Sequence, residues 1–123
     1  MMGMQQRMGE ILEGLTKAPG VLGAAIISRD GLCVKSAGRP ELSRETFSAM
    51  TATLMGAAEI ALGELGGGRG RHIVASTESM RMALVGASRD LLLVACTQRD
   101  ASIDDVLKRL EEAAASVAAA LGG

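Results

Sequence analysis

The sequence contains almost no aromatic side chains, with Phe47 the only one among 123 residues. A core without aromatic rings must be built from aliphatic residues and methionine, and the eight methionines can fill irregular gaps in it. The lack of rings also removes the stacking platforms on which single-stranded nucleic acids bind. Since the formal net charge is only −1, there is no electrostatic reason to expect a nucleic-acid partner.

Residue types that perform catalysis or hold metal ions are scarce as well. His72 is the only histidine, so the sequence offers neither a His-rich metal site nor a Cys-His pair. Cys33 and Cys96 lack C-x-x-C spacing, and each lies in an apolar run where a thiol behaves as a small buried hydrophobe. We therefore predict a protein that is not an enzyme and needs no metal or cofactor.

Long hydrophobic runs are absent too. No run approaches the roughly 18 uncharged apolar residues that a membrane span requires, and the first residues lack the apolar core of a signal peptide. With two cysteines that need no oxidising compartment, this predicts a cytoplasmic protein. Apolar residues make up 48% and charged residues 22% of the chain, which is typical of one packed domain, here residues 1–123.

The most informative segment that is present is a stretch of helix length. Between residues 46 and 63 the only charge is Glu59, and every other residue is apolar, small or an uncharged hydroxyl. We predict a helix over residues 43–65, with Ser43 as its N-cap and the glycines at 66–68 ending it. A helix without a polar face must be covered on more than one side. In so short a chain, we expect the second cover to be another copy of the protein.

The hydrophobic periodicity predicts three helices and five strands in the order α-β-β-α-β-β-β-α. The predicted helices cover residues 4–16, 43–65 and 102–121, and the predicted strands cover residues 21–28, 32–36, 71–77, 80–87 and 91–97. Short connections make the last three strands a meander, and Ser102 is expected to cap the last helix with Asp105 in its first turn.

The predicted fold class is α+β, with a five-stranded antiparallel sheet. Residues 21–28 and 91–97 are apolar on both faces and should lie side by side at the centre. The terminal helices are expected on one face and the long helix on the other. Residues 71–77 are mixed in character and should form an open edge beside the long helix.

An open edge and a poorly covered helix that adjoin each other predict a homodimer. Pairing the edge strands about a two-fold axis would extend the sheet and bring the two long helices together. The predicted interface comprises Phe47, Met50, Leu54, Gly56, Ala57, Ala61, Arg71, His72, Ile73, Val74 and Ala75.

Three features together resemble the Roadblock family: the Ala18-Pro19-Gly20-Val21 entry, the turn within residues 25–32, and the closing meander. This family includes dynein light chains and a bacterial gliding-motility GTPase activator. The resemblance implies a profilin-like fold and dimers joined through the third strand and second helix. It also implies regulation or scaffolding of a small Ras-like GTPase, with any activation occurring in the partner's active site.

Two further groups of residues suggest sites. The glycine-rich segment at residues 66–71 invites a phosphate-loop interpretation, but it lacks the Lys-Ser/Thr of such loops and precedes a strand where a helix is needed. A flexible connection fits better. Arg69, Arg71 and Arg81 are candidates for contact with a GTPase. Their alternative role is to keep the sheet edge solvated and free of aggregation.

Two other functions remain open at this point. One is a ligand-binding sensor of the profilin or PAS type, which needs a pocket with convergent polar groups. The polar-poor interior argues against it. The other is a structural adaptor that assembles proteins without touching a GTPase, and the sequence does not separate this role from GTPase regulation.

Overall fold

Five strands form one antiparallel sheet in the computed structural model, which describes residues 3–122. The strands are β1 (Val21–Ser28), β2 (Cys33–Gly38), β3 (His72–Ser76), β4 (Met80–Gly86) and β5 (Leu91–Gln98). Their order across the sheet is β2-β1-β5-β4-β3. The two strands that are apolar on both faces, β1 and β5, therefore pair with each other, and β3 is a terminal strand. Both features confirm the sequence-based expectation.

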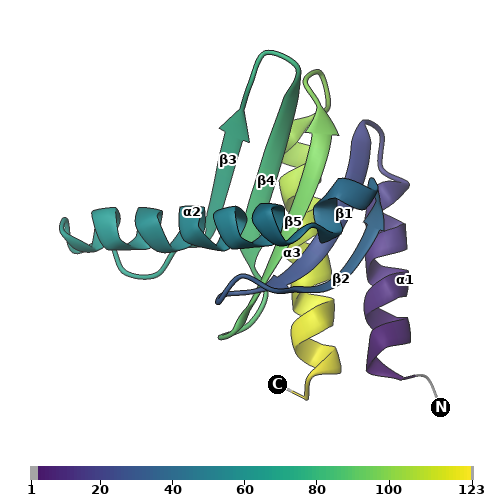
Figure 1. Ribbon diagram of the computed structural model, residues 1–123, viewed down its shortest axis with the longest axis horizontal. Helices are drawn as coiled ribbons and strands as arrows, with labels where there is room; N and C mark the ends of the chain where they lie inside the picture. The colour runs from purple at the N-terminus through teal and green to yellow at the C-terminus, as the bar shows by residue number, and fades with distance from the viewer. Residues whose placement is uncertain (1–2, 123) are drawn as a thin grey trace.

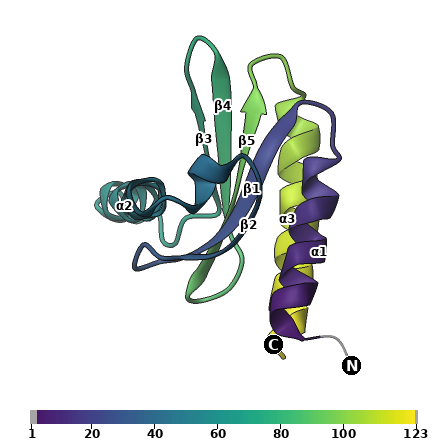
Figure 2. The same cartoon turned by 45° about the vertical axis from the view of Figure 1, so that its right-hand side comes forward.

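The helices lie in two layers on opposite faces of the sheet (Figures 1 and 2). Helices α1 (Met4–Thr16) and α3 (Ile103–Ala120) cover one face, and α2 (Glu45–Gly63) crosses the other. Each layer encloses its own apolar core. Leu12, Leu93 and Leu110 belong to the core under α1 and α3, whereas Met55 and Leu84 belong to the core under α2. The predicted fold and its element order are confirmed.

The start of α2 differs from the prediction. The helix begins at Glu45 and its N-cap is Arg44, which provides no side-chain hydrogen bond. Ser43, the predicted N-cap, instead ends a short 3-10 helix, η1 (Pro40–Ser43), and its hydroxyl donates to the Pro40 carbonyl at 2.8 Å. The prediction was wrong because a serine hydroxyl can satisfy a nearby carbonyl as readily as a helix N–H.

The end of α2 is set by glycine, as predicted, but two residues earlier. Gly66 has a φ of +80°, Gly66 N–H donates to the Gly63 carbonyl, and Gly67 N–H donates to the Leu62 carbonyl. This pair of bonds is a Schellman motif, which closes a helix over a residue in the left-handed region. The helix therefore spans 19 residues, about 28 Å at 1.5 Å per residue, rather than extending to Leu65.

Strand β2 is shifted towards the C-terminus relative to the predicted residues 32–36. Leu32 is 63% exposed in the turn after β1, and the strand continues through Ala37 and Gly38, which were predicted as loop. Gly38 pairs with Gly23 and has a φ of +87°. A glycine at positive φ usually marks a turn. The sequence pattern therefore predicted a loop at Gly38, where the strand in fact continues because Gly38 pairs with Gly23.

Candidate partner-binding surface

Strand β3 forms one open edge of the sheet and differs on its two faces. Ile73 and Ala75 are half-buried, and Ile73 packs against the core under α2. His72, Val74 and Ser76 alternate with them and are exposed on the α3 side, because α3 packs over β4 and β5. This stretch of the sheet is therefore bare on the α3 side.

The backbone of β3 directs its free hydrogen-bonding groups away from the molecule at alternate residues. Gly86 N–H donates to the Arg71 carbonyl at 3.3 Å, and Thr77 N–H donates to the Met80 carbonyl at 2.9 Å. In an antiparallel ladder, hydrogen-bonded pairs alternate with pairs whose groups point outward. The odd-numbered residues of β3 thus bond to β4, and the backbone groups of His72, Val74 and Ser76 face outward.

The opposite edge of the sheet, β2, is better protected. It carries Lys35 at its centre, and the aliphatic stem of Lys35 packs over Gly9 of α1. Its pairing with β1 is interrupted by a register shift between Ile26 and Ile27. An edge lysine and a bulge are two devices that prevent strand pairing between molecules. Strand β3 has neither device, so it is the edge suited to pairing.

Helix α2 presents an uncharged face to solvent. Met50, Thr53, Ala57 and Ile60 recur at helical spacing on this face, and Met50 and Ile60 are 59% and 73% exposed. Two large apolar side chains exposed on one helix face make it a candidate surface for contact with another molecule. Glu59 is the single charged residue of this helix between its first residue and its C-cap, and it does not lie on this face.

The C-terminal part of α2 extends past β3, beyond the edge of the sheet (Figure 1). Leu62 lies seven residues after the fully buried Met55, on the same side of the helix, yet it is 51% exposed. Leu65, just beyond the helix, is 82% exposed. Exposed apolar side chains at this end of α2 therefore lie on the same side of the molecule as the open edge of the sheet.

Glu59 binds two other segments instead of facing solvent. Its carboxylate accepts from Arg29 Nη1 and from Gly70 N–H, both at 2.7 Å. The Gly70 N–H and the Arg29 guanidinium lower the pKa of Glu59 below its ordinary value. Arg29 lies in the β1–β2 turn and Gly70 just before β3. The sequence shows the charge of Glu59 but does not predict its partners, Arg29 and Gly70, which lie 30 and 11 residues away.

The predicted interface residues of α2 lie on different sides of the helix. Phe47 packs against the core under α2, and Leu54, seven residues later on the same side, is half-buried. Gly56 and Ala57 line a surface hollow of about 470 Å³ beside the β1–β2 turn. Met50 and Ala61 are exposed. The side of Leu54 and the side of Gly56 therefore face different surroundings.

A sequence model of the Roadblock/LC7 domain matches residues 8–97. The chain belongs to the Roadblock/LC7 family. No curated protein sequence matches it. The match covers α1 from Met8 onward, α2, and the sheet up to Thr97 in β5, so it includes the open edge and the uncharged helix face.

Solved structures of Roadblock/LC7 proteins have the same fold. A Roadblock/LC7 domain from Streptomyces avermitilis is 22% identical, with 93% of this chain and 97% of that chain covered and a TM-score of 0.85. The gliding protein MglB from Thermus thermophilus is 21% identical, with 98% and 92% covered and a TM-score of 0.86. An MglB described in a tetrameric arrangement is 22% identical, with 98% and 91% covered and a TM-score of 0.87.

The three arginines considered for GTPase contact do not form one cluster in this Roadblock/LC7 domain. Arg69 and Arg71 precede β3, and Arg69 Nη2 donates to the Arg89 carbonyl at 3.3 Å. Arg81 pairs with Ser76 at the opposite end of β3, about 17 Å away for five residues of extended chain. A single phosphate would be reached by one end of the strand only.

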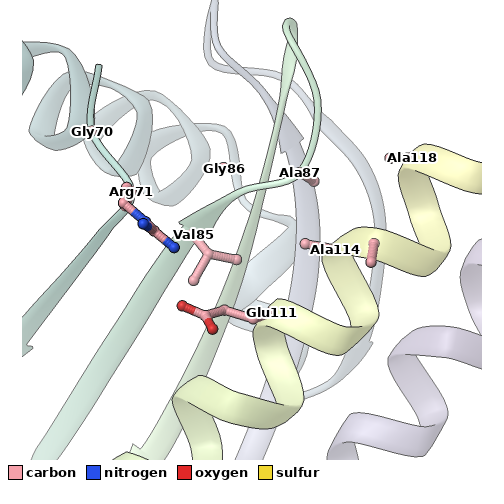
Figure 3. A pocket seen from close by; sticks show the side chains of 9 residues that line it. Gly70, Arg71, Val85, Gly86, Ala87, Glu111, Ala114 and Ala118 are labelled. Atoms are coloured by element: carbon pink, nitrogen blue, oxygen red, sulfur yellow. The ribbon is translucent and has the colours of Figure 1, made fainter. Parts of the chain in front are cut away.

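Arg71 borders a groove between the sheet and α3 of the Roadblock/LC7 domain. Figure 3 shows its guanidinium and the Glu111 carboxylate pointing toward one another across the groove, with Ala114 and Ala118 on the helix wall. The groove has a volume of about 430 Å³ and is open to solvent. Its lining of small residues and one charge of each sign offers little to fix the orientation of a small ligand.

Metal-ligand clusters, reactive thiols and membrane-spanning helices would each indicate a function for this Roadblock/LC7 domain. Within residues 3–122 no three His, Cys, Asp or Glu side chains lie together as a metal site would need. Burial raises the pKa of both the Cys33 and the Cys96 thiols, which opposes formation of the nucleophilic thiolate. Among the same residues, no helix combines the length and hydropathy needed to cross a membrane.

Proposed function

We propose that the protein is a homodimer, formed through β3 and α2, that binds a small Ras-like GTPase in the cytoplasm and regulates it. The observation that carries this proposal is the junction of an unprotected strand edge with the exposed apolar residues at the C-terminal end of α2. The two surfaces lie side by side and belong to the third strand and second helix, which are the elements that join Roadblock dimers.

Physical chemistry supports dimerisation at this junction. The free backbone groups of His72, Val74 and Ser76 gain partners when a second β3 pairs with them, and the exposed apolar side chains of Leu62 and Leu65 gain cover. An edge-to-edge interface about a two-fold axis uses the same surface on both copies and closes after two. Dimerisation would thus cover both the open strand edge and the exposed leucines, and the assembly would stop at two copies.

Family membership supports the GTPase as partner. Roadblock proteins include an activator of a gliding-motility GTPase, and two of the similar structures are MglB proteins, one described as a gliding protein. We infer that any activation occurs in the partner's active site, since burial raises the pKa of both thiols and no three His, Cys, Asp or Glu side chains lie together within residues 3–122. The chain is then a regulator and not an enzyme.

The test is capture of small GTPases from the native cell on the immobilised protein, with either GDP or a non-hydrolysable GTP analogue added. We expect one GTPase to be retained in preference with one nucleotide, and the hydrolysis rate of that GTPase to change when the protein is added. The matched control is Leu54→Arg, a change in the proposed dimer surface.

Two other outcomes of this test contradict the proposal. Partners captured equally with both nucleotides, and without a change in hydrolysis, would make the protein a GTPase-independent structural adaptor. A stoichiometric small molecule found by native mass spectrometry, together with no captured GTPase, would make it a profilin-like or PAS-like ligand sensor.

A further inference from the structure

We propose that β3 pairs with β3 of a second copy in one register only, with Val74 on the two-fold axis and Arg71 beside the partner's Glu78. This inference rests on the proposed homodimer and deepens it, because the edge is then complementary to itself and selects an identical chain over a paralogue.

Backbone geometry restricts the possible registers. Only residues with outward-facing groups, His72, Val74 and Ser76, can exchange hydrogen bonds with a second strand. In an antiparallel pair about a two-fold axis, even-numbered residues must therefore lie opposite even-numbered residues. Three registers satisfy this condition and keep most of the strand paired. They are centred on Ile73, Val74 and Ala75.

The residues that flank β3 favour one of these three registers. Centring on Ile73 would place Ser76 opposite Gly70, whose N–H already donates to Glu59 at 2.7 Å. Centring on Ala75 would place His72 opposite Glu78, which lies in the turn between β3 and β4. Centring on Val74 pairs His72 with Ser76 and Val74 with Val74, so all three outward residues find partners within the strand.

The charges that flank β3 fit the same register. With Val74 on the axis, Arg71 lies opposite the partner's Thr77, one residue from the partner's Glu78. Both Arg71 and Glu78 are exposed, and neither forms a salt bridge within residues 3–122. The Arg71 guanidinium points toward Glu111 across the groove beside α3 (Figure 3), but no salt bridge joins the two, so the exposed Arg71 side chain can turn toward the partner's Glu78. The two-fold axis repeats the contact, so each dimer has two Arg71–Glu78 pairs. A paralogue would need both charges at the same positions to match.

The position of α2 shows which side of the helix meets its partner. Helix α2 crosses the sheet near the start of β3 (Figure 1), so a two-fold axis at Val74 places the second α2 towards the end of β3. The side of α2 on which Gly56 lies faces the β1–β2 turn at the other end. The helices therefore meet through the side that carries Phe47, Leu54 and Ala61.

Cysteine cross-linking reads the register directly. In a hydrogen-bonded antiparallel pair the Cα atoms are about 5.5 Å apart, which suits a disulfide. Val74→Cys is made in full-length protein that also carries Cys33→Ser and Cys96→Ala, and oxidation is followed on a non-reducing gel. We expect rapid, nearly complete cross-linking of Val74→Cys. Ile73→Cys and Ala75→Cys, made in the same background, report the two alternative registers and should cross-link at least tenfold more slowly.

Charge reversal provides a second, independent readout. Arg71→Glu and Glu78→Arg, each alone, should raise the dimer dissociation constant about fivefold at low salt, since each places two like-charged pairs across the interface. The double variant R71E/E78R should restore the wild-type value. Failure of the double variant to recover would overturn the Arg71–Glu78 contact.

The outcomes separate this inference from the proposed function. Fastest cross-linking at residue 73 or 75 overturns the register but keeps the dimer. A dimer in sedimentation that cross-links at none of the three positions overturns pairing through β3. A wild-type protein that stays monomeric at all concentrations overturns the proposed homodimer itself.

Discussion

Glu59 is the residue that contributes most clearly to the structure outside the apolar cores. Its carboxylate holds the β1–β2 turn, through Arg29, and the entry to β3, through Gly70, with side-chain exposures of 23% for Arg29 and 18% for Glu59. Loss of the charge leaves Arg29 without its ion-pair partner. We expect Glu59→Gln to lower the free energy of unfolding by about 1–3 kcal/mol, the usual contribution of hydrogen bonds to a charged group. Urea denaturation at pH 7 measures this.

The matched control for Glu59→Gln is Glu41→Gln. Arg39 lowers the pKa of Glu41 to about 2, but this ion pair is exposed, at 44% and 40%. Exposed pairs contribute little because water solvates both charges. Glu41→Gln should therefore shift the urea midpoint much less than Glu59→Gln. Equal effects of the two substitutions would contradict a special role for Glu59.

The pH dependence of stability follows from the lowered pKa of Glu59. The ordinary value for glutamate is 4.5, and the folded value lies below it. A carboxylate with a lowered pKa in the folded state stabilises that state fully above the unfolded value, and this stabilisation is lost as pH falls through the folded value. The difference in urea midpoint between wild type and Glu59→Gln should be largest near pH 7 and shrink below about pH 4.5. A difference that grows in acid would contradict this assignment.

Two glycines with opposite surroundings provide another pair of variants. A Cβ added at Gly38 would lie 2.6 Å from the Gly23 Cα, and Gly38 has a positive φ, whereas a Cβ at Gly56 in α2 meets nothing within 4 Å. We expect Gly38→Ala to lower the free energy of unfolding by about 2–4 kcal/mol. Gly56→Ala should raise it by about 0.5–1 kcal/mol because alanine favours the helix. Thermal melts of both variants check the opposite signs.

At the scale of elements, hydrophobic periodicity predicted the strands and helices well wherever the apolar pattern was continuous. Helix α1 and strand β1 have the predicted bounds, since α1 buries Met8, Leu12 and Leu15 at helical spacing and β1 buries five consecutive residues. The larger errors fall at residues 32–44, where the chain leaves one edge of the sheet, whereas the ends of the other elements differ by no more than two residues. The exposed Leu32, the paired Gly38 and the hydroxyl of Ser43 each respond to neighbours distant in sequence. Local patterns contain no information about such neighbours.

Helix α2 offers a test of which of its sides meets the partner. Leu54→Arg places a charge on the side that we expect to pack against the second α2, and burying an unpaired charge is strongly unfavourable. It should raise the dimer dissociation constant at least 100-fold. Gly56→Arg introduces the same side chain on the side facing the β1–β2 turn, where there is open space. It should leave the dimer intact. Analytical ultracentrifugation over a range of concentrations compares the two.

At the scale of the whole molecule, the sequence predicted the sheet order, the two helical layers and the open edge, because each depends on which faces are apolar. It did not predict how the candidate surface is divided. Phe47 and Gly56 were assigned to one interface, although nine residues of helix place them on opposite sides of α2, and the structure gives these sides different neighbours. It also did not predict that Glu59 anchors Gly70.

A proline in β3 tests whether the edge of one molecule is completed by another. The outward-facing N–H of Val74 bonds to nothing in β4, so Val74→Pro removes no hydrogen bond within the monomer, and proline is tolerated in edge strands. The variant should keep its circular dichroism spectrum, sediment as a monomer and, if the GTPase binds the dimer, no longer capture it. Ala75→Pro is the matched control. Its N–H faces β4, so this variant loses a ladder hydrogen bond and leaves a carbonyl of β4 unpaired, which should lower the free energy of unfolding by about 1–3 kcal/mol. A Val74→Pro protein that remains dimeric would show that the two copies meet elsewhere than β3.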